Sequence, residues 1–217
     1  MGHKENILIV APHPDDAFIS CGGFILQTGA KYNFTVACMT SIHSFPDSSV
    51  RMGEERAALQ KLEELSHTEI ELLFFPGKDK WLYKEYQEMV AFLEERLAKK
   101  DYKFIFCPHP EDTHQDHRSV SEAVLSACRY ECNIIFNETP SSIKFHPSMF
   151  VEVSEDNVEI KKRISKYYAS QVLGAAKNHK FSLSDFIEAK LISHGAKSRT
   201  CKYAEGYKPY RYYLPTI

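Results

Sequence analysis

Two short clusters of histidine and aspartate are the chemically richest segments of the sequence. One spans residues 13–16 (His-Pro-Asp-Asp) and the other residues 114–117 (His-Gln-Asp-His). Imidazole nitrogens and carboxylate oxygens bind zinc, and the same groups are common general acids and bases. The two clusters together predict a metal-dependent active site.

One histidine pair and one carboxylate from these clusters form a ligand set typical of catalytic metals. His13, Asp16 and His117 supply three ligands, and catalytic zinc sites have three protein ligands plus an open position for water. Ferrous iron accepts the same set, but oxygenase sites of that type usually occur in antiparallel barrels. We therefore expect Zn²⁺, with Fe²⁺ or another divalent ion as the alternative.

The other side chains of the clusters can transfer protons. Of the adjacent Asp15 and Asp16, one carboxylate can bind the metal while the other takes a proton from metal-bound water, and the spacing does not decide which. One of His114 and His117 can likewise ligate while the other donates to a leaving group or a developing oxyanion. Asp116 would orient that imidazole, or cap the helix that follows.

Alternating strands and helices position the two clusters. The predicted strands are residues 6–11, 34–40, 69–75, 102–107, 133–137 and 149–153. The predicted helices are residues 20–31, 48–65, 83–100, 116–128, 155–170 and 182–194. This alternation implies parallel βαβ units. We expect an α/β fold, namely a three-layer, Rossmann-like, doubly wound and mostly parallel sheet with helices on both faces.

Each cluster follows the carboxyl end of a predicted strand, the first and the fourth. Ligands of open parallel sheets bind in the crevice beyond these ends. If the strand order is 3-2-1-4-5, the first and fourth strands are neighbours. The two clusters would then meet in space.

The composition describes an ordinary globular chain. It has 217 residues, 43% hydrophobic and 26% charged, with a net charge of −2 that gives no field to attract nucleic acid or an anionic membrane. We see no apolar run long enough for a signal peptide core or a membrane span and expect a cytoplasmic protein. The six cysteines form no CxxC pair and are expected to be reduced. The sequence carries no signal for or against a homo-oligomer.

Two weaker motifs are assigned to the fold. Gly22 and Gly23 lack the GxGxxG pattern, and the acidic turn before them would repel a pyrophosphate, so nucleotide binding is not expected. Trp81, Tyr83 and Tyr86 could stack on a sugar, but aromatic residues ahead of a helix are more often core, which we favour.

The clusters and their flanking residues resemble a known family. Residues 11–16 (Ala-Pro-His-Pro-Asp-Asp), residues 21–23 (Cys-Gly-Gly) and residues 112–117 (Asp-Thr-His-Gln-Asp-His) are similar to those of the zinc-dependent N-acetylglucosaminyl deacetylases, the PIG-L or LmbE-like de-N-acetylases. Weaker similarities lie at 51–54, 168–171 and 204–206. The likeness covers nearly the whole chain and implies a single domain over residues 1–217.

The resemblance implies a role for each residue. The implied metal ligands are His13, Asp16 and His117. The implied proton-transfer residues are Asp15 as general base, His114 as acid or oxyanion stabiliser, and Asp116 as its orienting partner. Arg51 and Glu54 would hold substrate hydroxyls, although an arginine and a glutamate three apart on a helix are often a solvated pair.

The expected function is therefore a metal-dependent hydrolase. It would remove the N-acetyl group from a small N-acetylated sugar or sugar conjugate of the N-acetylglucosamine type, releasing acetate and a free amine. One alternative is an amidase for another small amide, such as a thiol conjugate. Another is a non-catalytic, metal-dependent sugar-binding protein, against which the intact proton-transfer residues argue.

Overall fold

A computed structural model describes residues 4–43, 47–129, 132–171 and 182–213 of the chain. Its strands are β1 Glu5–Ala11, β2 Tyr32–Cys38, β3 Ile70–Phe74, β4 Phe104–Pro108, β5 Ile134–Asn137, β6 Met149–Glu152 and β7 Ala204–Arg211. Its helices are α1 Asp16–Thr28, α2 Ser48–Ser66, α3 Tyr86–Lys99, α4 Gln115–Ala127, α5 Glu155–Ile164 and α7 Leu183–Ser198. Two short 3-10 turns are η1 Leu82–Lys84 and η2 Ser165–Tyr167.

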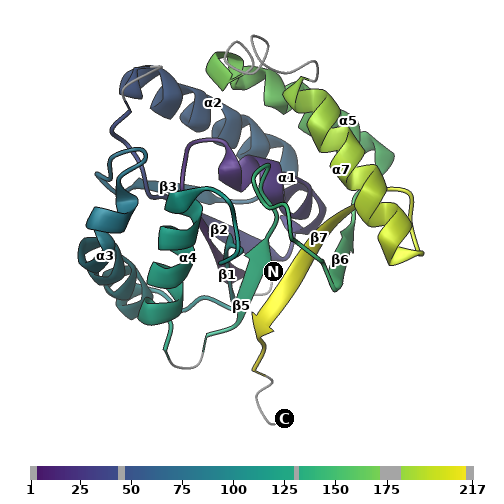
Figure 1. Ribbon diagram of the computed structural model, residues 1–217. Coiled ribbons are helices and arrows are strands. Elements are labelled where there is room, and N and C mark those ends of the chain that lie inside the picture. The colour runs from purple at the N-terminus through teal and green to yellow at the C-terminus, as the bar shows by residue number, and fades with distance from the viewer. Residues whose placement is uncertain (1–3, 44–46, 130–131, 172–181, 214–217) are drawn as a thin grey trace.

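The strands form one mostly parallel sheet. Its order is β3-β2-β1-β4-β5-β7-β6, in which the first five strands are parallel and β7 is antiparallel to both of its neighbours. Helices α3 and α4 cover one face, and α1, α2, α5 and α7 cover the other (Figure 1). The predicted fold class and the order 3-2-1-4-5 are confirmed.

Strand β1 is the centre of the core. Ile7 and Ile9 pack with residues of α1 and α2, whereas Leu8 and Val10 pack with residues of α3 and α4. All four side chains are fully buried. A strand covered on both faces needs apolar residues at every position, which explains the unbroken hydrophobic run at the start of the sequence.

Strand β7 has no counterpart among the predicted elements. Gly206 and Pro209 interrupt its sequence, and both residues are uncommon within strands. The register with β5 shifts near Pro209, since Ile134 pairs with Arg211 but Ile135 pairs with Pro209. This irregularity accommodates a proline that cannot donate a ladder hydrogen bond.

Two local expectations need correction. Helix α1 begins at Asp16 rather than near residue 20, so the first cluster runs directly into the helix. Trp81 and Tyr83 are exposed rather than buried in the core, and their rings stack on each other at 6.0 Å.

Among the described residues, no helix is both long and apolar enough to cross a membrane. The six cysteines all lie in the described ranges, and none of them forms a disulfide bond.

A buried ion pair joins α1, α5 and β7. Lys161 of α5 is 1% exposed and donates from Nζ to Glu205 of β7 and to the carbonyl of Ile19. Glu205 also accepts hydrogen bonds from the backbone N–H groups of Gly23 and Phe24, at 2.8 and 2.6 Å. This carboxylate therefore fixes the helix that follows the first cluster.

Replacement of Lys161 by methionine should lower the free energy of unfolding by about 3–5 kcal/mol, because Glu205 would keep a buried charge without its cation. Urea denaturation followed by circular dichroism measures the change. The matched control is Lys202→Met, which breaks an exposed pair with Glu155 and should cost less than about 1 kcal/mol. Equal losses in the two variants would contradict the assignment.

Candidate active site

The first cluster forms the turn between β1 and α1, and neighbouring side chains hold its backbone on both sides. Thr40 donates from Oγ1 to the carbonyl of Pro12 at 2.8 Å, and Arg51 donates from Nη2 to the carbonyl of Pro14 at 3.0 Å. The backbone N–H of His13 donates to Oδ2 of Asp16 at 3.1 Å. The turn is thereby fixed before any ligand binds.

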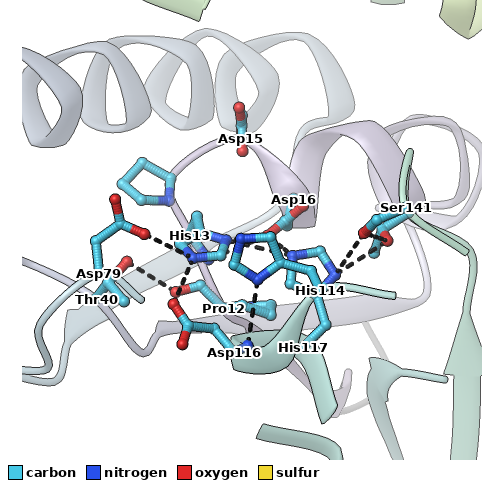
Figure 2. Close-up of polar contacts among 12 residues, drawn as sticks. Pro12, His13, Asp15, Asp16, Thr40, Asp79, His114, Asp116, His117 and Ser141 are labelled. Carbon is cyan, nitrogen blue, oxygen red and sulfur yellow. Dashed lines mark hydrogen bonds and ion pairs between the residues drawn. The ribbon is translucent and has the colours of Figure 1, made fainter. Parts of the chain in front are cut away.

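The second cluster opens α4 beyond the end of β4. His114 caps the helix by accepting from the backbone N–H of Asp116 at its Nδ1, at 3.2 Å. Because β1 and β4 are neighbours, the clusters meet as predicted. The ring of His13 lies 4.8 Å from that of His114 and 5.2 Å from that of His117, centroid to centroid (Figure 2).

Three atoms of the two clusters form a triangle suited to a metal ion. Asp16 Oδ2 lies 3.2 Å from His13 Nδ1 and 3.3 Å from His117 Nε2, and the two nitrogens lie 3.3 Å apart. Zinc bonds to nitrogen and oxygen of about 2.0–2.2 Å at tetrahedral angles separate the ligand atoms by about 3.3–3.6 Å. All three residues are buried. The donor set therefore fits a catalytic metal.

A second grouping of His13, His114 and Asp116 also brings ligand atoms within 4.8 Å of one another. The Asp116 carboxylate already accepts from the backbone N–H groups of Lys80 and Leu82, at 2.6 and 3.3 Å. Those bonds occupy lone pairs that a metal would need, so the first grouping is the better site.

Carboxylates lie beside the outer nitrogens of both candidate ligand histidines. His13 Nε2 lies 3.1 Å from Asp116 Oδ2 and 3.3 Å from Asp79 Oδ1, and His117 Nδ1 lies 3.2 Å from Asp112 Oδ2. Such partners orient an imidazole and select the tautomer that leaves the inner nitrogen for the metal. Asp116 thus contacts His114 through its main chain and His13 through its carboxylate.

The candidate ligand residues carry opposite charges. Burial by itself would lower the pKa of His117, but the charge of Asp16 and hydrogen bonds to Asp112 and Asp16 raise it to about 9. Burial would raise the pKa of Asp16, but the charge and hydrogen bond of His117 hold it well below its usual range. A divalent cation would replace the imidazolium protons in this cluster.

Asp15 differs from its neighbour Asp16 in both position and charge. Burial, followed by the negative charge of Asp16, raises the pKa of Asp15 to about 7, against the opposing charge of Arg51. Arg51 Nη2 lies 3.8 Å from Asp15 Oδ2. A carboxyl with this pKa can both accept and return a proton near neutral pH.

His114 is held as a neutral hydrogen-bond donor. Burial, followed by the positive charges of His13 and His117, lowers its pKa below the usual value. Its Nδ1 accepts from the Asp116 backbone, so the neutral ring carries its proton on Nε2. That proton is available to a bound substrate.

An open pocket covers the cluster. It is lined by His13, Asp15, Asp16, Arg51, Asp79, Lys80, His114, His117, Pro140, Ser141 and Gln171. Glu54 is not among these residues, since both of its oxygens accept from Ser170, at 2.8 Å from the backbone N–H and 2.6 Å from the hydroxyl. A direct contact between Glu54 and the substrate stays a prediction. In the structure, Glu54 holds Ser170, the neighbour of the pocket residue Gln171.

The sequence patterns did not include Asp79 and Glu55, and they included Asp112 only as part of the quoted motif, without a role. Asp79 follows β3 and Asp112 follows β4, so the rule that placed the clusters at strand ends could have found both. Glu55 lies on α2 on the same helical face as Ala58 and Leu59, and a charged residue at an apolar position is a signal of its own.

The family of the chain is shown by two comparisons. The PIG-L family, described as GlcNAc-PI de-N-acetylase, matches residues 8–128. The chain belongs to this family. This PIG-L protein is also 30% identical over 185 residues to the uncharacterized deacetylase YaiS of Escherichia coli (strain K12). The matched region covers 82% of this chain and 91% of YaiS.

Solved structures show the same fold at low identity. The N,N'-diacetylchitobiose deacetylase of Pyrococcus horikoshii matches with a TM-score of 0.73 at 17% identity, covering 94% of this chain and 83% of that one. The 4-carboxy-2-hydroxymuconate hydratase GalB of Pseudomonas putida KT2440 matches with a TM-score of 0.71 at 16% identity, covering 98% and 99%. Because a hydratase shares the fold, the family and the site carry the functional assignment.

After chelator treatment and dialysis have removed bound metal, the PIG-L protein should bind one added Zn²⁺ per chain. His117→Ala removes a ligand and should abolish this tight binding, whereas Asp116→Asn weakens the support of His13 and should cost about 10- to 100-fold in affinity. Competition with a chromophoric chelator measures both changes. The control is His146→Ala, an exposed histidine. Unchanged zinc binding by His117→Ala would rule out the proposed triangle.

Proposed function

We propose that this PIG-L protein is a metal-dependent N-deacetylase of a small N-acetylated sugar or sugar conjugate. The observation that carries the proposal is the triangle of His13, Asp16 and His117, with Asp15 and His114 lining the same pocket. This arrangement supplies metal ligands, a base and a hydrogen-bond donor at one place. We favour Zn²⁺ as the ion, with Fe²⁺ or another divalent ion as the alternative.

The ion, when bound, supplies Lewis acidity toward the acetyl carbonyl and lowers the pKa of water at the site. Asp15 accepts the proton of the attacking water, which its pKa of about 7 permits. The positive charge of Arg51 opposes the rise in the pKa of Asp15, so that a larger fraction of this carboxyl is ionised. Asp16 has the opposite pKa shift and remains ionised as a ligand.

His114 acts on the other reacting atoms. Its Nε2–H donates to the carbonyl oxygen as negative charge develops there. The nitrogen of the leaving amine needs a proton before the C–N bond breaks, and Asp15 returns to it the proton taken from the attacking water. Acetate and a free amine are the products.

The polar pocket favours a substrate with hydroxyl groups. Asp79, Ser141 and Gln171 offer hydrogen-bond acceptors and donors around the cluster, and Arg51 lines the same pocket. The PIG-L description and the Pyrococcus horikoshii enzyme both concern N-acetylated sugars. We therefore place N-acetylglucosamine-type compounds ahead of other small amides such as thiol conjugates. A cytoplasmic location stays a prediction.

The Zn²⁺-loaded protein should release acetate from N-acetylglucosamine or from one of its glycosides. Asp15→Asn keeps the size of the side chain but removes the base, and kcat should fall by about 100- to 10,000-fold. His114→Ala removes the donor to the oxyanion and should cost about 100- to 1000-fold. Enzymatic detection of acetate measures all three proteins, and zinc titration shows that the variants still load metal.

The substrate panel includes N-acetylated sugars, their conjugates and N-acylated thiol conjugates. Turnover of the thiol conjugates alone would replace the proposed substrate class and keep the mechanism. Full activity of Asp15→Asn would overturn the assigned base. Sugar binding without any acetate release would support the non-catalytic alternative.

A further inference from the structure

Asp15 has a strained backbone. Its φ is 107° and its ψ is −34°, a conformation that side-chain-bearing residues rarely adopt. Such a residue costs on the order of 1–3 kcal/mol and persists only where the surrounding contacts impose it. The base of the proposed reaction therefore needs an anchor.

Glu55 of α2 provides that anchor. Its side chain is fully buried, and its Oε2 accepts from the backbone N–H of Asp15 at 2.9 Å. Among the described residues, this is the only hydrogen bond that the Asp15 N–H donates. Thr40 and Arg51 hold the carbonyls of Pro12 and Pro14, and the Asp15 carbonyl accepts from the backbone N–H of Ile19 in α1. Glu55 is therefore the side chain that holds the N–H of the strained residue.

Tyr168 fixes the Glu55 carboxyl in turn. The Tyr168 hydroxyl donates to the same Oε2 at 2.8 Å. The tyrosine is fully buried, and its ring packs 5.5 Å from that of Phe18 in α1. Two donors therefore meet one oxygen, one from the catalytic turn and one from the segment beside Gln171.

The other oxygen of Glu55 has no such role. Glu55 Oε1 is buried and makes no hydrogen bond with any residue in the described ranges. Burial is the main reason that the pKa of Glu55 is raised to about 8, with the charge of Asp15 adding to it. The Glu55 carboxyl therefore contributes one well-placed acceptor oxygen.

We propose that Glu55 and Tyr168 are positioning residues that hold Asp15 in its strained turn, so that the Asp15 carboxylate faces the reacting water. The proposal rests on the proposed function in one respect, the role of Asp15 as base. Neither Glu55 nor Tyr168 lines the pocket, so neither touches the substrate. Their effect passes through the main chain of Asp15.

The contacts of Glu55 define a matched pair of variants. Glu55→Gln keeps a carbonyl oxygen at the Oε2 position and puts the amide nitrogen at the Oε1 position, where no hydrogen bond is lost. Glu55→Leu removes the acceptor and keeps a side chain of similar bulk. Because a displacement of about 1 Å can cost about 100-fold in rate, kcat of Glu55→Leu should fall by about that factor.

The expected pattern separates positioning from general stability. Glu55→Gln should keep most of the wild-type kcat, and the KM and zinc affinity of both variants should stay near those of the wild type. Tyr168→Phe should lower kcat by less than Glu55→Leu does. The double variant should be no slower than Glu55→Leu, since Tyr168 acts through Glu55. The control is Glu64→Leu, an exposed position on the same helix.

A crystal structure of Glu55→Leu gives a readout that does not depend on activity. The φ of Asp15 should leave the positive region once its anchor is lost. If the wild type lacks deacetylase activity, the proposed function fails while this structure still tests the anchor. A folded Glu55→Leu with wild-type kcat, an equal loss in Glu55→Gln, or an unchanged φ of Asp15 would overturn the proposal. Should Glu55→Leu not fold, Tyr168→Phe carries the same kinetic test.

Discussion

The parallel pairing of β1 with β4 is the constraint on which the site depends. The register pairs Ile9 with Phe106, so the two strands end side by side, at Ala11 and Pro108. The candidate ligands His13 and Asp16 follow the end of β1 directly, and His117 lies in the first turn of α4, the helix that follows β4. Parallel strands deliver their carboxyl ends to one edge of the sheet, and helices α1 and α4 then begin there. Backbone hydrogen bonds between β1 and β4 therefore bring the active-site residues together, although none of those residues forms these bonds.

The turn after β1 places two adjacent carboxylates in surroundings that shift their pKa values in opposite directions. Asp16 is drawn toward two imidazoles and stays ionised, whereas Asp15 is buried beside it and titrates near neutrality. The positive φ of Asp15 separates them. Pairs of acids whose surroundings push their pKa values apart are a general means of obtaining a base and a charged group from the same side chain.

Much of this arrangement follows from the sequence, and the exceptions have physical causes. The apolar run of residues 6–11 predicts a central strand, and the strand-end rule brings the two clusters together. The spacing of the residues did not separate the roles of Asp15 and Asp16, which only the family resemblance assigned, since these roles depend on a backbone conformation that composition does not encode. Strand β7 escaped detection because Gly206 and Pro209 obscure its period. Glu55 was not identified because its proposed role depends on one hydrogen bond to the main chain of Asp15, which no sequence motif marks.

Asp116 binds two parts of the molecule with one carboxylate. Its Oδ2 accepts from the Lys80 backbone and lies 3.1 Å from His13 Nε2, while its Oδ1 accepts from Leu82. The segment after β3, which carries Asp79 and Lys80 into the pocket wall, is thus joined to a candidate metal ligand through a single group. Linkage is reciprocal: an ion that strengthens the bond between His13 and Asp116 also steadies this wall, and a substrate that steadies the wall tightens the hold on the ion. Binding of the proposed metal and binding of the proposed substrate would therefore strengthen each other through Asp116.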